Sequence, residues 1–335
     1  MWTKPRTAEG SRTPPPPIIV SDTAADGEQS GLEDGRVAPV RDRVHQDGRL
    51  ARARACVELT KPGITRLVVI TSAAGYSLAT SAGFDPVTFV HAMLGIALSA
   101  SGANAFNQYI ERDADFRMRR TARRPLPSGR IAPVEAFAVA ATLATLGLLQ
   151  LLLFVNITTT LVVAASLLSY VLVYTPLKRR TWHATVAGAV PGALPILAGW
   201  TAAGGAIDAR GLALFGIVFI WQMPHFYALA WMYRDDYLRG GFRMLSAFDP
   251  AGQRTARQTV AWTIGLLAVS LLPVGLGMAG LLYGVAAAAF GLAFLAVGAA
   301  MLAGIDQQRA RRVFLASVLY LPALLGTLVL DRFLR

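Results

Sequence analysis

The chain has 335 residues, of which 54% are hydrophobic and only 16% are charged, and its formal net charge at pH 7 is +12. An ordinary soluble domain is not this apolar, so we predict an integral membrane protein whose excess of bases lies in loops on the cytoplasmic side of a lipid bilayer. Because the basic residues separate apolar runs and do not line one soluble face, we expect no nucleic acid partner.

Residues 1–57 differ in composition from the rest of the chain. They contain four prolines in a row from Pro14 to Pro17, scattered glycine and serine, and mixed acids and arginines without a periodic apolar pattern. We predict a disordered cytoplasmic tail. It lacks an apolar signal-peptide core, and its many acids are atypical of a mitochondrial transit peptide. The expected location is therefore a bacterial cell (inner) membrane, and the mitochondrial inner membrane is the alternative.

From Lys61 onward, apolar runs of membrane-spanning length follow one another. A helix needs about 17 to 25 residues to cross a bilayer. We therefore predict an all-α polytopic membrane domain over residues 58–335 with about nine helices. The expected spans are 67–83, 87–110, 133–154, 157–175, 184–203, 211–232, 259–278, 280–303 and 312–331.

The loops between these spans alternate in charge. The loops that would face one side of the membrane are rich in arginine and lysine. The loops that would face the opposite side carry almost no basic residues. By the positive-inside rule, this alternation places the N-terminus in the cytoplasm. The base-rich loops lie at 112–130, 178–180, 234–257 and 309–312.

Acids and arginines crowd together at the end of the second predicted span. If the helix continues past Ile110, then Asn107, Glu111 and Asp115 stand at i, i+4 and i+8 on one face at its cytoplasmic end. One amide and two carboxylates are hard oxygen ligands that suit Mg²⁺. Phosphate oxygens of the substrate usually complete the coordination shell of such an ion. The alternative is a solvated helix end with local ion pairs.

A second acidic pair, Asp235 and Asp236, follows the sixth predicted span. Four crossings separate the ends of the second and sixth spans, so both acidic ends should lie at the same membrane face. Two such patches could hold two Mg²⁺ ions on opposite sides of one diphosphate. Basic side chains from neighbouring loops would supply the cationic complement: Arg120, Arg123 and Arg124 after the second span, and Lys178, Arg179 and Arg180 after the fourth.

These motifs resemble those of a known family. The residues Asn107, Glu111 and Asp115, with the arginines that follow, resemble the first aspartate-rich motif of the intramembrane UbiA-type prenyltransferases. The segment YTPLKRRT (174–181) is similar to the basic motif of that family. The run GAVPGALPILAGW (188–200) and the segment WQMPHF (221–226), followed by Asp236, are most similar to the branch that farnesylates heme. The resemblance covers roughly residues 58–330.

The resemblance implies a UbiA-type helix bundle and an activity. The activity is Mg²⁺-dependent transfer of a farnesyl group from farnesyl diphosphate to the vinyl group of heme B, which gives heme O. The alternative acceptor is 4-hydroxybenzoate or another quinone precursor. Heme A synthase, which acts next in heme A formation, is a candidate partner.

The resemblance also implies roles for individual residues. The Mg²⁺ ligands would be Asn107, Glu111 and Asp115, with Asp236 at a second metal site. The diphosphate would be bound by Arg120, Arg124, Lys178 and Arg179, with Asp235 beside them.

His225 lies deep in the sixth predicted span. An ionisable side chain at that depth is costly, so a functional role is the default hypothesis. His225 could ligate heme iron or act as a base; the alternative is a neutral histidine that is hydrogen-bonded to a neighbouring helix.

Two rival classes remain for the whole chain. A transporter would also have many spans with Pro and Gly breaks, but its charged groups would lie at the membrane midplane. A purely structural subunit would leave the stacked acids unexplained.

Overall fold

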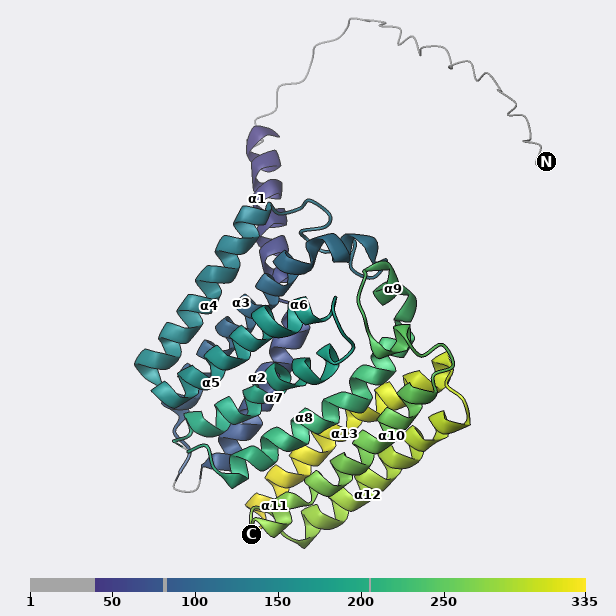
Figure 1. Cartoon of the computed structure of the whole chain (residues 1–335). Helices are drawn as coiled ribbons and strands as arrows, with labels where there is room; N and C mark the ends of the chain where they lie inside the picture. The colour runs from purple at the N-terminus through teal and green to yellow at the C-terminus, as the bar shows by residue number, and fades with distance from the viewer. Residues whose placement is uncertain (1–39, 81–82, 205) are drawn as a thin grey trace, which may run out of the picture. The chain divides into compact units, whose positions relative to one another are not determined.

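The computed structural model describes residues 40–335, with the exception of 81–82 and 205, and all the regular structure in that part of the chain is helical (Figure 1). The compact unit runs from His45 to Arg335. The α-helices are α1 Val40–Leu59, α2 Pro62–Ala79, α3 Pro86–Arg117, α4 Pro133–Phe154, α5 Ile157–Leu168, α6 Thr175–Leu177, α7 Ala184–Ala202, α8 Ala209–Met232, α9 Arg234–Arg239, α10 Gln253–Ser270, α11 Leu272–Gly275, α12 Leu281–Ala299 and α13 Gln307–Phe333. A π-helix, η1 Ser169–Tyr174, joins α5 to α6, and two 3₁₀ turns are η2 Leu245–Ala247 and η3 Ala300–Ala303.

Eight helical segments of the described chain are long and apolar enough to cross a membrane, which confirms the predicted all-α polytopic fold. They are α3, α4, the continuous run from α5 through α6, α7, α8, the run of α10 with α11, the run of α12 with η3, and α13. The predicted first span, 67–83, falls on α2, an 18-residue helix that is not among the eight. Polar side chains interrupt α2, since Arg66 lies in its first turns and Thr71 and Ser72 in its middle.

The predicted tail of residues 1–57 lies largely outside the described residues. From Val40 onward, however, the chain forms α1, which continues to Leu59. Arginine, alanine and leucine, which favour helices, fill its second half. Ala55 and Leu59 are fully buried against Ala105 of α3 and Ala140 of α4. Tertiary packing therefore stabilises a helix whose apolar pattern is too short to stand out in the sequence.

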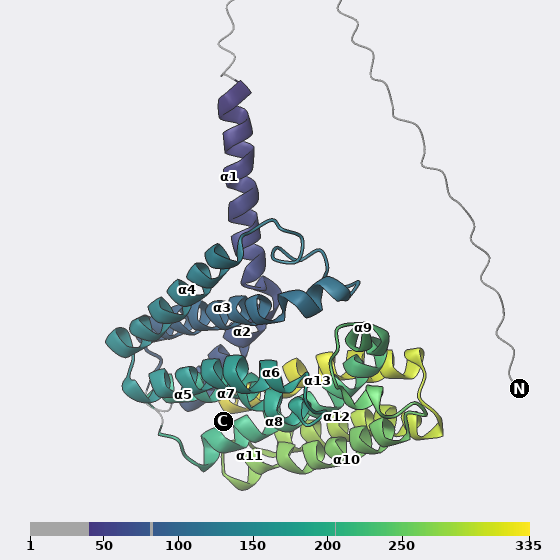
Figure 2. The same cartoon turned by 45° about the horizontal axis from the view of Figure 1, so that its top comes forward.

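Helix α3 is long and sits against α4 (Figure 2). Asp85 caps its start by accepting a hydrogen bond from the Val87 N–H at 2.9 Å, and Pro86 occupies the first helical position. Small residues let the two helices approach closely: a Cβ on Gly102 would lie 2.6 Å from the backbone nitrogen of Ala144. This contact fixes the 32-residue helix whose far end carries the candidate site.

Helices α2 and α7 approach each other even more closely. A Cβ on Gly199 of α7 would overlap the carbonyl oxygen of Ser72, and one on Gly75 of α2 would overlap the carbonyl oxygen of Ile196. The Ser72 hydroxyl also donates to the Pro195 carbonyl at 2.8 Å. The position of α2, and of Lys61 just before it, therefore depends on the absence of side chains at this crossing.

Replacement of Gly199 by alanine tests this crossing. Gly199→Ala should destabilise the protein by about 1 to 3 kcal/mol, because α2 must move away from α7 to admit the methyl group. Thermal unfolding in detergent measures the effect. The control is Gly326→Ala on α13, where a Cβ would meet nothing within 4 Å. If Gly199→Ala unfolds at the temperature of this control, the two helices do not need the glycine.

Candidate active site

Three acceptor side chains form a buried ladder on α3. Asn107, Glu111 and Asp115 lie on successive turns of one face, and only 1%, 4% and 0% of their surfaces are exposed. The predicted i, i+4, i+8 stacking follows from the continuation of α3 past Ile110 to Arg117. A solvated helix end would leave these side chains exposed, so this burial argues against that alternative.

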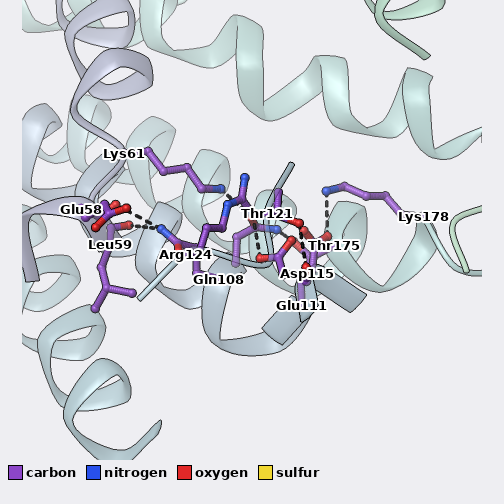
Figure 3. Close-up of polar contacts among 11 residues, drawn as sticks. Glu58, Leu59, Lys61, Gln108, Glu111, Asp115, Thr121, Arg124, Thr175 and Lys178 are labelled. Atoms are coloured by element: carbon purple, nitrogen blue, oxygen red, sulfur yellow. Dashed lines mark hydrogen bonds and ion pairs between the residues drawn. The ribbon is translucent and has the colours of Figure 1, made fainter. Parts of the chain in front are cut away.

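Each member of the ladder contacts one cation from a different loop, and Figure 3 labels two of these pairs, Glu111 with Lys178 and Asp115 with Arg124. Lys61, before α2, donates from Nζ to Asn107 Oδ1 at 2.6 Å. The Nζ of Lys178, after α6, lies 2.7 Å from Glu111 Oε1. Arg124, in the turns after α3, donates to Asp115 Oδ2 at 2.7 Å. Together they form a site of three acceptors and three cations that chain segments far apart in the sequence assemble.

Lys61 is the residue of this site that sequence reasoning missed. It is the one non-glycine residue with positive φ, at 48°, in the described part of the chain. Gln108 supports this turn by donating to the carbonyl of Leu59 at 2.9 Å. Burial, followed by the positive charge of Arg124, lowers the pKa of Lys61 to about 7. A lysine immediately before the first apolar run is the signal that could have identified it.

Lys178 has the opposite electrostatic balance. Burial alone would lower its pKa, but the carboxylate of Glu111 outweighs burial and holds the pKa of Lys178 above its ordinary value. Its ammonium group also lies 4.5 Å from the ring centroid of Tyr174 and 5.4 Å from that of Phe242. Lys178 therefore stays charged beside Glu111.

The ladder fits a hard divalent cation. Asp115 Oδ1 is buried and has no hydrogen-bond partner, and a buried carboxylate oxygen is costly to leave unpaired. An amide oxygen and two carboxylates from one helix face also match the ligand preference of Mg²⁺. Within the described residues, no three His, Cys, Asp or Glu side chains gather as a metal cluster. A cation here would therefore need the Asn107 oxygen, and phosphate oxygens, to complete its shell.

The second acidic pair behaves differently. Asp236 is buried and accepts from the backbone N–H groups of Arg119 at 3.1 Å and Arg120 at 3.3 Å, and from the guanidinium of Arg239. Burial opposes the charge of Asp236, but these donors, Arg239 first, outweigh burial and lower its pKa. Asp235 is exposed. Asp236 thus ties α9 to the turn after α3, and it would have to exchange one of these donors to hold a metal.

The predicted phosphate-binding bases divide into two groups. Arg124 and Lys178 contact the ladder directly. Arg120 is exposed, with its guanidinium carbon 5.1 Å from the Tyr233 ring centroid. Arg179 is exposed as well, and neither of these two arginines forms an ion pair with an acid of the described chain. Both side chains are therefore accessible to an anion in solution.

A cavity of about 380 Å³ begins next to the ladder. Asn104, one turn before Asn107, lines it, and so does Tyr174, whose ring contacts Lys178. Its wall is otherwise largely apolar and comes from α2, α3, α5, η1, α7, α8 and α13, with Trp221, His225 and Phe226 on α8. The cavity thus connects the surroundings of the charged ladder with His225.

The hydrogen bonds of His225 define its tautomer. The Ser317 hydroxyl donates to the Phe314 carbonyl at 2.6 Å, so its oxygen accepts from the Nδ1–H of His225 at 2.8 Å. The other ring nitrogen, Nε2, is then an unprotonated acceptor. Trp221 stacks on the imidazole with ring centroids 5.2 Å apart. The bond to α13 is the one expected of a structural histidine, yet His225 also lines the cavity.

Comparison with known proteins places these features in a family. The model of the UbiA prenyltransferase family matches residues 68–321. Among curated relatives, the protoheme IX farnesyltransferase of Solibacter usitatus is 44% identical over 288 residues, which are 83% of this chain and 99% of that protein. The protoheme IX farnesyltransferase of Salinibacter ruber is 45% identical over 276 residues, 82% of this chain and 98% of that protein.

Solved structures share the fold at low sequence identity. A structure of digeranylgeranylglyceryl phosphate synthase has a TM-score of 0.72 at 19% identity and covers 85% of this chain and 99% of its own. A UbiA homologue from Archaeoglobus fulgidus, bound to GPP and Mg²⁺, has a TM-score of 0.63 at 15% identity and covers 82% and 99%. Because the family model covers most of the chain and the curated relatives align over nearly their whole lengths, the chain is a prenyltransferase of the UbiA family.

Proposed function

We propose that this enzyme transfers a farnesyl group from farnesyl diphosphate to a vinyl group of heme B, giving heme O, with Mg²⁺ as cofactor. The observation that carries the proposal is the buried ladder with its unpaired Asp115 oxygen, next to a largely apolar cavity that His225 lines. The names of the curated relatives support heme B as acceptor. The Mg²⁺ in the neighbouring family structure supports the metal.

The ladder and its cations would bind the leaving group. Asn107, Glu111 and Asp115 would hold Mg²⁺, which would neutralise the charge that develops on the diphosphate as it leaves. Lys61, Lys178 and Arg124 each contact one ladder oxygen. These three cations, together with the exposed Arg120 and Arg179, would bind the phosphate oxygens of the diphosphate.

The cavity would bind the prenyl chain. Its volume of about 380 Å³ is near the lower end of the roughly 300 to 1,000 Å³ of ordinary ligand pockets. That space suits one prenyl chain and does not also enclose a porphyrin. The unprotonated Nε2 of His225 is a group that can ligate heme iron or accept a proton, and it would orient the acceptor at the cavity wall.

The reaction balances without a redox partner. The bond between C1 of the farnesyl group and the diphosphate oxygen breaks, and its electron pair leaves with the diphosphate. The terminal vinyl carbon of heme B supplies its π electrons to C1. Water then adds its oxygen to the other vinyl carbon and loses a proton, which gives the hydroxyethylfarnesyl group. The apolar cavity would keep water away from the allylic cation before the vinyl group attacks.

We also place the enzyme in the cell inner membrane as a multi-pass protein with a cytoplasmic N-terminus. The alternation of base-rich and base-poor loops supports this orientation. This orientation would put the ladder at the cytoplasmic face of the membrane. Heme A synthase, which would take up the product, is the partner that this location suits.

A product assay tests the function directly. Purified protein in detergent, given Mg²⁺, farnesyl diphosphate and heme B, should form a more hydrophobic heme that chromatography resolves, and chelation of Mg²⁺ should stop its formation. Glu111→Gln should lower the rate about a hundredfold or more, because a metal ligand is lost at the leaving group. If heme B stays unchanged and 4-hydroxybenzoate is prenylated, the acceptor is 4-hydroxybenzoate and not heme B.

Asp113→Asn is the matched control for that substitution. Asp113 lies on the same turn of α3 as Glu111, but its side chain is 75% exposed and forms an ion pair with Arg112, at 3.8 Å. It should keep near wild-type activity. Equal activity of the Glu111→Gln and Asp113→Asn variants would remove the metal role from the ladder.

Steady-state kinetics can test whether His225 acts on heme B, the prenyl acceptor, and not on farnesyl diphosphate, the prenyl donor. His225→Ala should raise the KM for heme B more than the KM for farnesyl diphosphate, because it removes the nitrogen that would orient heme, whereas the diphosphate would be held at the ladder. Ser317→Ala should produce a smaller change in the same direction, since it removes the acceptor that holds Nδ1–H. An equal rise of both KM values would indicate that His225 supports the fold and not the acceptor.

A further inference from the structure

The amide of Asn107 is held at both of its ends. Its Oδ1 accepts from Lys61 at 2.6 Å, and its Nδ2 donates to Thr175 Oγ1 at 3.2 Å. Asn107 and Thr175 are each only 1% exposed, so water does not compete for these bonds. When its side chain is protonated, Lys61 can only donate, so the oxygen of the amide then faces Lys61 and its NH₂ group faces Thr175.

The hydroxyl hydrogen of Thr175 is committed elsewhere. Thr175 Oγ1 donates to the carbonyl of Tyr170 at 2.8 Å, and the backbone N–H of Thr175 donates to the same carbonyl. With its hydrogen used, the hydroxyl offers only lone pairs to α3. It can therefore accept from the NH₂ group of Asn107 but cannot donate to the amide oxygen, so the Thr175 hydroxyl accepts only one of the two amide orientations.

The π-helix η1 explains why Thr175 stands at this place. The span from Ile157 to Leu177 is helical throughout, but from Ser169 to Tyr174 its hydrogen bonds reach one residue further back than in an α-helix. This insertion rotates the residues that follow it, and the first of them is Thr175. π-Helical turns inside a helix are uncommon and occur frequently at functional sites.

We propose that Thr175 is a positioning residue that orients the Asn107 amide with its oxygen toward the metal site. The proposal rests on the Mg²⁺ role proposed for the ladder. An amide turned by 180° would present its NH₂ group to Lys61 and to the incoming cation, which is repulsive on both counts. Thr175 does not touch the metal, and nothing in its residue type alone marks it as part of the site.

Two substitutions of Thr175 distinguish the effect of its hydroxyl group from the effect of its side-chain shape. Thr175→Val keeps the branched side chain and removes the acceptor, whereas Thr175→Ser keeps the acceptor. The probe is Mn²⁺ titrated into the purified protein with inorganic pyrophosphate and followed by electron paramagnetic resonance. Thr175→Val should weaken Mn²⁺ binding about 10- to 100-fold, as loss of a group that orients a metal ligand usually does. Thr175→Ser should restore most of the affinity.

A second background tests the orientation itself. In Asn107→Asp, both carboxylate oxygens are equivalent, so the side chain has no wrong face. Adding Thr175→Val to Asn107→Asp should therefore cost almost no further Mn²⁺ affinity, giving a strongly non-additive double-mutant cycle. Thermal unfolding of the metal-free variants reports separately on the fold.

Three outcomes would overturn the proposal. The first is wild-type Mn²⁺ affinity in Thr175→Val, which would leave the proposed function intact. The second is the same loss from Thr175→Val in the Asn107→Asp background, which would show a packing effect. The third is wild-type protein that binds no Mn²⁺ with pyrophosphate and keeps its activity after chelation; that result would remove the metal role of the ladder as well.

Discussion

The constraint on which the site depends is the burial of two carboxylates on one helix face. An unpaired charge in a protein interior costs several kcal/mol, so Glu111 and Asp115 require a cation each. The chain supplies these cations from outside the helix, Lys178 for Glu111 and Arg124 for Asp115. The loops after α3 and after α6 are thereby drawn to the same end of α3, and Lys61 joins them from the turn before α2 through Asn107.

The segment after α8, which includes α9, is hydrogen-bonded to the backbone of these loops. Asp236 accepts from the N–H groups of the turn after α3, and the N–H of Arg243 donates to the carbonyl of Lys178 at 2.8 Å. The segment after α8 is thus bonded to two of the three segments that carry a ladder cation, those of Arg124 and Lys178. The acid that the sequence suggests as a second metal ligand thus also holds the backbone of Arg119 and Arg120.

Local periodicity made part of this site predictable from the sequence. The ladder follows from residue spacing once the second span is read as a helix that continues past Ile110, and the apolar runs predict the spans. The partners of the ladder could not be predicted this way, because Lys61 lies 46 residues from Asn107 and Lys178 lies 67 residues from Glu111. Spacing likewise suggested two similar acidic patches, whereas the bonds of Asp236 depend on a turn that only the fold brings near.

The backbone is irregular where it borders the cavity, and this irregularity provides the space for a substrate. Pro191 and Pro195 lie within α7 and both line the cavity. Pro195 cannot donate to the carbonyl of Pro191, and the Ser166 hydroxyl takes its place at 2.9 Å. On the same helix, a Cβ on Gly188 would overlap the ring of Tyr174. Prolines and glycines of α7 and the π-helix η1 therefore shape one side of the cavity wall, next to the ladder.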